Sequence, residues 1–474
     1  MAQTILGRQE EKRELERSYR SGRPEFVAVY GRRRVGKTFL VRELFDQRLC
    51  FYHTGLSPSE LDAGQLKEQQ LREFHRSLIA WGGHPTSVPS DWFEAFDALR
   101  QLVLSRPRER RKVLFIDEMP WMDTPRSGFV TALEHFWNGW AAGQAQIMLI
   151  VCGSATSWMA NNLINNYGGL YNRLTAEIHL RPFTLGECEA YYRANSLVLD
   201  RYDQVQSYMV FGGVPYYLSL LQKGKSLAQN IDLLFFADNA KLRNEFTRLY
   251  RSLFKNADDC MTVIRLLAGR REGYTRKEIA EATKLPYGGG LTATLRSLEE
   301  SDLIVSYIPY NASQRQTTYR LTDFFSIFHL TFLDRRKTSN ARFWTDNVGG
   351  QQLTAWRGFS FEGVCFAHID KIKQALGISG VQTEVSAWHG DEAQIDMIID
   401  RQDRVLNLCE IKFCTDTFSI DRSYDAALRR KQSCLDAMNG KHKSIHLTMI
   451  TTYGISQNEY SGRVQAQLTM EDLF

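Results

Sequence analysis

The sequence predicts an α/β protein of several domains, with an open parallel sheet near its N-terminus. The chain has 474 residues, which at roughly 150 residues per domain suggests about three domains. Apolar runs at 26–30, 113–116 and 147–152 are each followed by glycine or by acidic residues. Such runs are typical of strands buried on both faces of a parallel sheet. The composition, 43% hydrophobic and 24% charged, excludes a disordered chain, a collagen and a coiled-coil rod.

Composition also limits the compartment and the partners. No run of about 18 uncharged apolar residues occurs, so we expect no contact with a membrane. The N-terminus is charged from its start, so no signal peptide is expected. The eight cysteines lack CxxC pairs and zinc spacing, which favours reduced thiols in a cytoplasmic protein. The net charge of +5 is mildly basic and does not by itself indicate a nucleic-acid partner.

The stretch from Gly31 to Thr38 has the pattern G-x-x-x-x-G-K-T between a predicted strand and a predicted helix. This context is typical of a P-loop, in which the glycines let backbone N–H groups point at phosphate oxygens. Lys37 is expected to reach the β- and γ-phosphates, and the Thr38 hydroxyl to ligate Mg²⁺. The loop therefore predicts a nucleoside triphosphate site formed by Gly31, Arg32, Arg33, Arg34, Val35, Gly36, Lys37, Thr38 and Phe39.

Polar residues follow the other two apolar runs. Asp117 and Glu118 end the run at 113–116. We expect Asp117 to hold Mg²⁺ through water and Glu118 to orient and deprotonate an attacking water, which predicts hydrolysis. Ser154 follows the third run and can touch that water or the γ-phosphate. An alternative role for Ser154 is to cap the next helix.

These motifs resemble the AAA+/STAND branch of P-loop ATPases, in particular an archaeal and bacterial family whose members often carry a C-terminal nuclease-like domain. The segment LGRQEEKREL resembles the opening Gly-Arg-x-x-Glu box of the family, and DEMPWMD matches its extended acidic motif. The resemblance implies ATP or another purine triphosphate as the nucleotide, with Gly7 and Arg8 against the base. It also implies a P-loop core over 1–183 and a helical lid over 184–256.

Two further residues are assigned by this resemblance. Residues 168–183 resemble the segment that carries an arginine finger, which maps to Arg173. A finger normally acts from a neighbouring subunit, so it implies a homo-oligomer, or a partner protein, on ATP binding. Residues 211–218 resemble the Gly-x-Pro element of the lid, which places Pro215 on the nucleotide. The alternatives are a surface salt bridge for Arg173 and a helix-breaking turn for Pro215.

Residues 257–335 predict a winged helix-turn-helix. The pattern gives a helix, a second helix capped by Thr275 and Glu278, a glycine turn, a third helix and two alternating strands. The segment 257–330 holds 9 basic and 9 acidic residues, so DNA contact and a structural or partner role both remain open. Arg315 and Arg320 on the predicted wing are the candidate DNA contacts.

The last part of the chain, residues 356–474, carries a second group of charged residues in an apolar setting. It follows a polar, glycine-containing stretch at 340–356 that predicts a linker. Glu410 and Lys412 lie two apart in a predicted strand, so both project to one face. Asp396 lies on the adjacent strand of a hairpin and is expected to pair near residue 408.

The arrangement resembles the PD-(D/E)xK nuclease superfamily, with a restriction-endonuclease-like α/β fold. The resemblance implies that Asp396, Glu410 and the Ile411 carbonyl hold Mg²⁺, that Lys412 positions the nucleophile, and that Glu362 completes the ligand set. Lys431 or Gln432 can face the same pocket. Ile395 stands where the superfamily pattern has proline, and 13 basic against 16 acidic residues make this part slightly acidic. An ion pair on an edge strand and a fold without activity are the alternatives.

The preferred hypothesis is an ATPase that couples its nucleotide state to Mg²⁺-dependent processing of DNA or another nucleic acid. One alternative is a STAND-like signalling or assembly switch whose C-terminal domain is an inactive docking module. Another is a DNA-binding regulator that acts through the winged helix.

Overall fold

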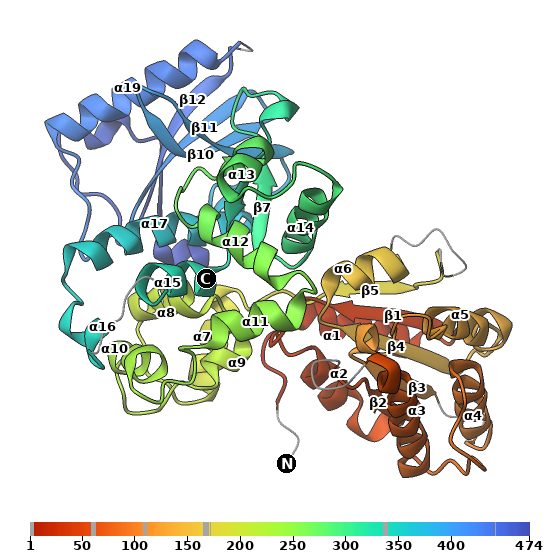
Figure 1. Cartoon of the computed structure of the whole chain (residues 1–474). Helices are drawn as coiled ribbons and strands as arrows, with labels where there is room; N and C mark the ends of the chain where they lie inside the picture. Colours follow the sequence, from red (N-terminus) through yellow and green to blue (C-terminus); the bar gives the residue numbers. More distant parts are fainter. Residues whose placement is uncertain are drawn as a thin grey trace. The chain divides into compact units, whose positions relative to one another are not determined.

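The computed structural model describes residues 4–57, 63–107, 111–164, 170, 172–334, 340–440 and 442–474. The chain divides into two compact units, Met1–Arg181 and Pro182–Phe474 (Figure 1). The predicted parallel-sheet core lies in the first unit, and a further sheet lies in the second, so the α/β class is confirmed. No helix among the described residues has the length and hydropathy that a membrane span requires.

The first unit is built on a five-stranded sheet in the order β2-β3-β4-β1-β5, and all neighbouring strands are parallel. The three strands predicted from apolar runs are adjacent, as β3, β4 and β1. Because parallel strands end at the same edge, Asp117, the last residue of β3, lies at the same edge of the sheet as Gly31 and Ser154, which follow β1 and β4. The strands are β1 Glu25–Tyr30, β2 Leu49–Thr54, β3 Lys112–Asp117, β4 Ile147–Gly153 and β5 Ala176–His179.

Helices cover both faces of this sheet, because alternate residues of each strand project to opposite sides. In β1, Phe26 and Ala28 join the core formed with α3, α4 and α5, whereas Val27 and Val29 join the core formed with α1 and α2. The helices are α1 Gln9–Arg20, α2 Lys37–Phe45, α3 Ala63–Ala80, α4 Trp92–Leu104, α5 Phe129–Gly139 and α6 Thr156–Met159.

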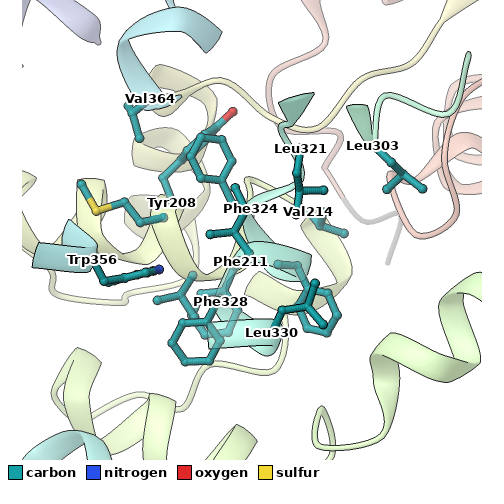
Figure 2. Packing of buried hydrophobic residues seen from close by; sticks show 14 of the residues in the cluster. Tyr208, Phe211, Val214, Leu303, Leu321, Phe324, Phe328, Leu330, Trp356 and Val364 are labelled. Atoms are coloured by element: carbon teal, nitrogen blue, oxygen red, sulfur yellow. The ribbon is translucent and has the colours of Figure 1, made fainter. Parts of the chain in front are cut away.

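The second unit begins with helices that pack around aromatic side chains. Figure 2 shows Phe211 of α8, Phe324 and Phe328 of α15, and Trp356 of α17 in this core. The helices are α7 Leu185–Ala194, α8 Arg201–Phe211, α9 Pro215–Leu218, α10 Leu227–Ile231, α11 Glu245–Leu253, α15 Phe324–Phe332, α16 Phe343–Asp346, α17 Gln351–Ala367 and α18 Ile369–Ala375.

A three-stranded antiparallel sheet in the order β6-β8-β7 and three helices form what we call the three-stranded module, residues 257–321. Its second helix begins with the predicted capping box of Thr275 and Glu278. The loop between β7 and β8 is tied to the C-terminal sheet, because the Tyr310 N–H donates to the Ala387 carbonyl oxygen at 3.2 Å. The elements are α12 Ala257–Leu267, β6 Tyr274–Thr275, α13 Arg276–Thr283, α14 Gly289–Glu300, β7 Ile304–Tyr307 and β8 Thr318–Leu321.

The C-terminal sheet has the strand order β13-β12-β11-β10-β9. Strands β9, β10 and β11 are antiparallel neighbours, whereas β11, β12 and β13 are parallel. Met397 and Cys409 join the aromatic helical core on one face, and Ile398 and Leu408 pack with α19 on the other. The elements are β9 Thr383–His389, β10 Gln394–Arg401, β11 Val405–Lys412, α19 Arg422–Met438, β12 Ser444–Thr451 and β13 Ala466–Thr469.

The expected pairing of Asp396 near residue 408 is wrong by two positions. Leu408 pairs with Ile398, and Cys409 pairs with Met397, so Asp396 lies opposite Glu410. The turn is centred one residue later than expected because Arg404 adopts a left-handed φ of 70° at its end.

The expectation of a linker at 340–356 is also wrong. This stretch contains α16 and the start of α17, and its residues Trp344 and Trp356 are buried in the aromatic core. One cluster of buried apolar side chains includes residues on both sides of this stretch, from Phe183 to Leu473. Most residues of the stretch are polar or glycine, which suggested a linker, but its two tryptophan side chains are buried in the core.

Candidate nucleotide site and C-terminal carboxylate site

The loop between β1 and α2 depends on glycine at both ends. Gly31 has a φ of 142°, and a Cβ there would lie 2.2 Å from the Leu180 carbonyl oxygen. Gly36 has a φ of 93° and occupies the N-cap of α2. Side chains at either position would be strained. The backbone therefore curls at the edge of the sheet and leads directly into the N-terminus of a helix, an arrangement suited to anions.

The Lys37 side chain lies inside this loop. Its ammonium donates to the carbonyl oxygens of Gly31 at 2.8 Å and Arg32 at 2.9 Å, and the residue is 5% exposed. The ammonium is thus held at the centre of the curl, where its charge adds to that of the helix N-terminus.

Thr38 and Asp117 meet where α2 begins and β3 ends. The Thr38 hydroxyl donates to Asp117 Oδ2 at 2.7 Å, and Asp117 Oδ1 accepts the Glu118 N–H at 3.0 Å. A hydroxyl oxygen and a carboxylate oxygen side by side fit Mg²⁺, which prefers hard oxygen ligands. Burial, and after it the nearby Asp117 charge, raise the pKa of Tyr52 to about 12. The Asp117 carboxylate therefore lies beside a poorly solvated part of the protein.

Glu118 is held by the end of the neighbouring strand. Its backbone is left-handed, with a φ of 46°. Its carboxylate accepts the Ser154 N–H at 3.1 Å and also the Ser154 hydroxyl. The helix-cap alternative for Ser154 is wrong, since Ala155 occupies the N-cap of α6. Ser154 instead determines where the Glu118 carboxylate lies.

The predicted Gly7 and Arg8 box lies against the same loop. Gly7 and Arg8 both have left-handed backbones, with φ of 62° and 57°, and Arg8 occupies the N-cap of α1. The Arg8 guanidinium is 5% exposed and donates to the Val35 carbonyl oxygen at 3.3 Å.

Sequence reasoning missed a partner of the P-loop. The Arg33 guanidinium lies 5.9 Å from the Trp121 ring centroid. Trp121 was visible within the acidic motif, but only the folded loop shows its neighbour.

Arg173 and Pro215 lie in different units of the chain. Arg173 is exposed, and its N–H donates to the Leu170 carbonyl oxygen at 3.1 Å. The structure records no ion pair of its guanidinium with the residues that it describes. Residues 168, 169 and 171 of the same predicted segment lie outside the described residues. Pro215 is the first residue of α9, which follows Gly212 and Gly213 in left-handed conformations.

The carboxylate of Glu410 is buried and surrounded by donors. It is 1% exposed. Its Oε1 accepts the Tyr424 hydroxyl at 2.7 Å and lies 2.9 Å from the Lys412 ammonium, and its Oε2 accepts the Lys431 ammonium at 2.5 Å. Burial opposes ionisation, but Lys412 and Lys431 outweigh it and hold the pKa of Glu410 below its usual value.

Asp396 and Glu362 lie close enough to interact with each other. Asp396 Oδ2 accepts the Ile411 N–H at 3.0 Å, and burial together with the Glu410 charge raises the pKa of Asp396. Burial and then the Asp396 charge raise the pKa of Glu362 to about 7. Glu362 Oε1 lies 3.7 Å from a guanidinium nitrogen of Arg271, in the three-stranded module.

The three carboxylates supply the hard oxygen atoms that a divalent cation binds, so their chemistry fits such a cation. In this arrangement, however, cationic side chains of the chain itself lie against them. Among the described residues, no group of three or more His, Cys, Asp or Glu side chains is arranged to hold a metal. We call Glu362, Asp396, Glu410 and Lys412 the C-terminal carboxylate site.

Of the two arginines predicted on the wing, only one is exposed. Arg315 lies on an exposed turn at Gln314–Gln316. Arg320 instead packs its guanidinium 4.4 Å from the Phe366 ring centroid, and burial lowers its pKa. Of the two candidate contacts, Arg315 is therefore the exposed one, because the strand that carries Arg320 packs against α17.

A cavity of about 910 Å³ in the first unit lies elsewhere. It is lined by α4, α5 and the segment 82–89. None of the predicted site residues lines it, so its size does not make it the nucleotide site.

Comparisons with known proteins agree with the geometry of the P-loop. Residues 6–221 match the family model described as an ATPase domain predominantly from Archaea. An uncharacterized protein of Methanocaldococcus jannaschii is 21% identical over 419 residues, which cover 86% of this chain and 87% of that protein.

Two solved structures are also similar. The Walker-type ATPase of Pyrococcus abyssi is 19% identical with a TM-score of 0.48, covering 69% of this chain and 96% of that one. The ORC2 protein of Aeropyrum pernix, in ADPNP–ADP complexes, is 16% identical with a TM-score of 0.40, covering 70% and 94%. At this similarity the assignment depends on the family match and the loop geometry. Residues 6–221 therefore form a P-loop ATPase domain, and the prediction that the protein is an ATPase is confirmed.

Proposed function

We propose that this ATPase binds ATP and Mg²⁺ at the loop from Gly31 to Phe39 and that its nucleotide state controls nucleic-acid processing by the second unit. The observation that supports the first part most directly is the contact of Thr38 with Asp117, beside Glu118. It brings a P-loop hydroxyl, a metal-binding carboxylate and a candidate base to one edge of the sheet.

Each side chain has a defined part in this proposal. The loop N–H groups and the α2 N-terminus bind the phosphates. The Lys37 ammonium moves from the Gly31 and Arg32 carbonyls to phosphate oxygens, because charged acceptors bind it more strongly. Thr38 and Asp117 hold Mg²⁺, which neutralises charge on the transferred phosphoryl group. Glu118, positioned by Ser154, orients the attacking water and takes its proton.

The remaining nucleotide contacts follow from the family resemblance. Gly7 and Arg8 lie beside the P-loop and suit a place against the adenine. Arg173, which is exposed, acts on the γ-phosphate of a neighbouring copy, so ATP favours a homo-oligomer.

The ATPase part is tested with two variants. In Glu118→Gln, ATP binding should persist while turnover falls by roughly 100-fold or more, since the amide cannot accept the proton. In Lys37→Ala, both binding and turnover should be lost. Binding is measured by calorimetry and turnover by phosphate release.

Lys225→Ala, which changes an exposed lysine outside the site, is the matched control and should behave as wild type. Wild-type hydrolysis by both site variants would overturn the catalytic assignment.

For the second unit we propose a Mg²⁺-dependent nuclease at the C-terminal carboxylate site. Asp396, Glu410 and Glu362 hold the cation, and Lys412 positions the nucleophile. The three-stranded module serves as a winged helix that contacts DNA through α14, whose Thr292, Ala293 and Arg296 are exposed.

The nuclease is tested on plasmid, linear and single-stranded DNA with Mg²⁺, each with and without ATP. Cleavage that disappears in Asp396→Ala and in Lys412→Ala supports it. An ATP effect on cleavage that Lys37→Ala abolishes supports coupling. The control is Arg422→Ala on the exposed start of α19, which should cut as wild type.

A signalling or assembly switch is the second candidate, and one observation favours it. Glu410 is enclosed by two ammonium groups and a tyrosine hydroxyl, so the site is neutralised without a metal. A docking module would need no metal ion at these carboxylates. Absence of cutting on every substrate, together with an ATP-dependent change in oligomer size, supports the switch. A regulator acting through the winged helix requires sequence-selective DNA binding that weakens as salt rises.

A further inference from the structure

The loop of residues 270–273 connects α12 to β6 and reaches the C-terminal carboxylate site. We call it the 270–273 loop. Arg271 lies 3.7 Å from Glu362 Oε1, and its guanidinium lies 4.7 Å from the ring centroid of Phe359. Glu362 and Phe359 are one turn apart on α17, so Arg271 rests along this face of the helix.

The neighbouring residue of the loop contacts the strand next to β10. Glu272 Oε1 lies 3.4 Å from His389 Nδ1 on β9, and the Glu272 carbonyl oxygen accepts the Tyr307 hydroxyl at 2.7 Å. The loop therefore bridges α17, which carries Glu362, and β9, which pairs with the strand that carries Asp396.

The base of the loop is fixed, whereas its contacts with the site are weak. Arg270 Nε donates to the Gly273 carbonyl oxygen at 2.6 Å, and Gly273 packs so tightly on β8 that a Cβ would lie 2.1 Å from the Tyr319 carbonyl oxygen. The side chains of Arg271 and Glu272 are 48% and 31% exposed. Exposed ion pairs of this kind contribute little free energy, so they can break without unfolding the module.

The Arg271 guanidinium lies against the Glu362 carboxylate, one of the proposed cation ligands. Arg271 forms an ion pair with Glu362 from the three-stranded module. Arg320 of the same module and Lys412 also act on Glu362 through their charge, and Lys412 and Lys431 lie against Glu410. Arg271 thus places a positive charge beside Glu362 that a divalent ion would have to displace, so the ion gains less by binding there.

We propose that the 270–273 loop is a latch: Arg271 occupies Glu362 and keeps a divalent cation out of the C-terminal carboxylate site until the loop moves. The proposal rests on the proposed metal site of the second unit. A ligand that displaces the Arg271 and Glu272 side chains from α17 and β9 would open the latch without moving the module.

The test measures Mn²⁺ binding to the nucleotide-free full chain by electron paramagnetic resonance. Arg271→Ala should bind Mn²⁺ up to about fivefold more tightly than wild type, the effect of removing one competing surface charge. Arg271→Lys keeps the charge and should remain near wild type. The added affinity of Arg271→Ala should vanish when Asp396→Ala is combined with it. Thermal melts show that each variant is folded.

DNA cleavage measured on the same samples separates the latch from the nuclease. Tighter Mn²⁺ binding in Arg271→Ala without DNA cleavage supports the latch and overturns the proposed nuclease activity. Equal Mn²⁺ affinity in wild type and Arg271→Ala overturns the latch, even where both cut DNA. Absence of Mn²⁺ binding in all variants overturns it as well, because no cation is then being excluded.

Discussion

For Glu118, the sequence predicted the role of the residue but not its contacts. Its type and position predicted a catalytic base, because an acid at the end of a buried strand next to a P-loop has few structural uses. Its contact with Ser154 was not predictable, since it depends on β4 lying beside β3. The same limit applies to Arg320, whose place in the sequence suggested an exposed wing but whose guanidinium packs on Phe366.

A buried histidine in the first unit gives a pH prediction at this scale. His53 on β2 is 2% exposed, lies 2.9 Å from the Ser77 hydroxyl, and has its pKa lowered to about 3 by burial. An unfolded histidine binds its proton near pH 6.5. Between these values the unfolded chain binds more protons, so the free energy of unfolding rises with pH and its full contribution is present above about pH 6.5.

Replacing His53 by Asn should flatten this dependence. We expect the slope of unfolding free energy against pH, between pH 5 and 6, to fall by up to about 1.4 kcal/mol per pH unit. This slope is measured by unfolding the first unit in urea at several pH values in this range. His84→Asn changes an exposed histidine and should keep the wild-type slope. Equal slopes in all three proteins would contradict the prediction.

Among the elements, α16 shows why the linker expectation failed. The buried Asp232 accepts the N–H groups of Trp344 at 2.7 Å and Thr345 at 3.0 Å, as well as the Thr345 hydroxyl. This cap comes from a residue 112 positions earlier in the chain. A cap within the segment itself is visible in a sequence, as at Thr275, but one from a distant segment is not.

Asp232→Ala should therefore destabilise the second unit by about 2–4 kcal/mol, because it removes the acceptor for buried donors. Asp232→Asn keeps an acceptor and should cost less. Urea denaturation followed by tryptophan fluorescence measures both. Asp238→Ala, at an exposed position, is the control. A cost for Asp232→Ala as small as that of this control would show that α16 does not need the cap.

On the scale of the molecule, the second unit is one compact body in which the predicted domains share a core. Trp356, Phe361 and Val364 of α17 pack with α8 and α15 in the same cluster as residues of the three-stranded module and the C-terminal sheet. Figure 2 shows Leu303 and Leu321 of the three-stranded module as members of the cluster that also contains Phe324 and Val364.

A fragment of residues 182–335 should accordingly fail to fold. It keeps α8 and α15 but loses α17, which leaves a large apolar surface exposed. A fragment of residues 182–474 should be monodisperse and melt in one transition. Size-exclusion chromatography and thermal denaturation test both. A cooperative transition in the shorter fragment would show that the predicted boundary at 335 separates independent domains.

The sequence by itself determined the chemistry that is local: the glycine loop with Lys37 and Thr38, the acids at a strand end, and the ExK pair on one strand face. These follow from short spacings that the backbone geometry of a strand or a turn converts directly into position. Only the tertiary structure decided which strands are neighbours, that Asp396 lies opposite Glu410, and that Arg271 lies against Glu362. Such contacts join residues far apart in the chain, and they arise from burying a common core, which no local pattern records.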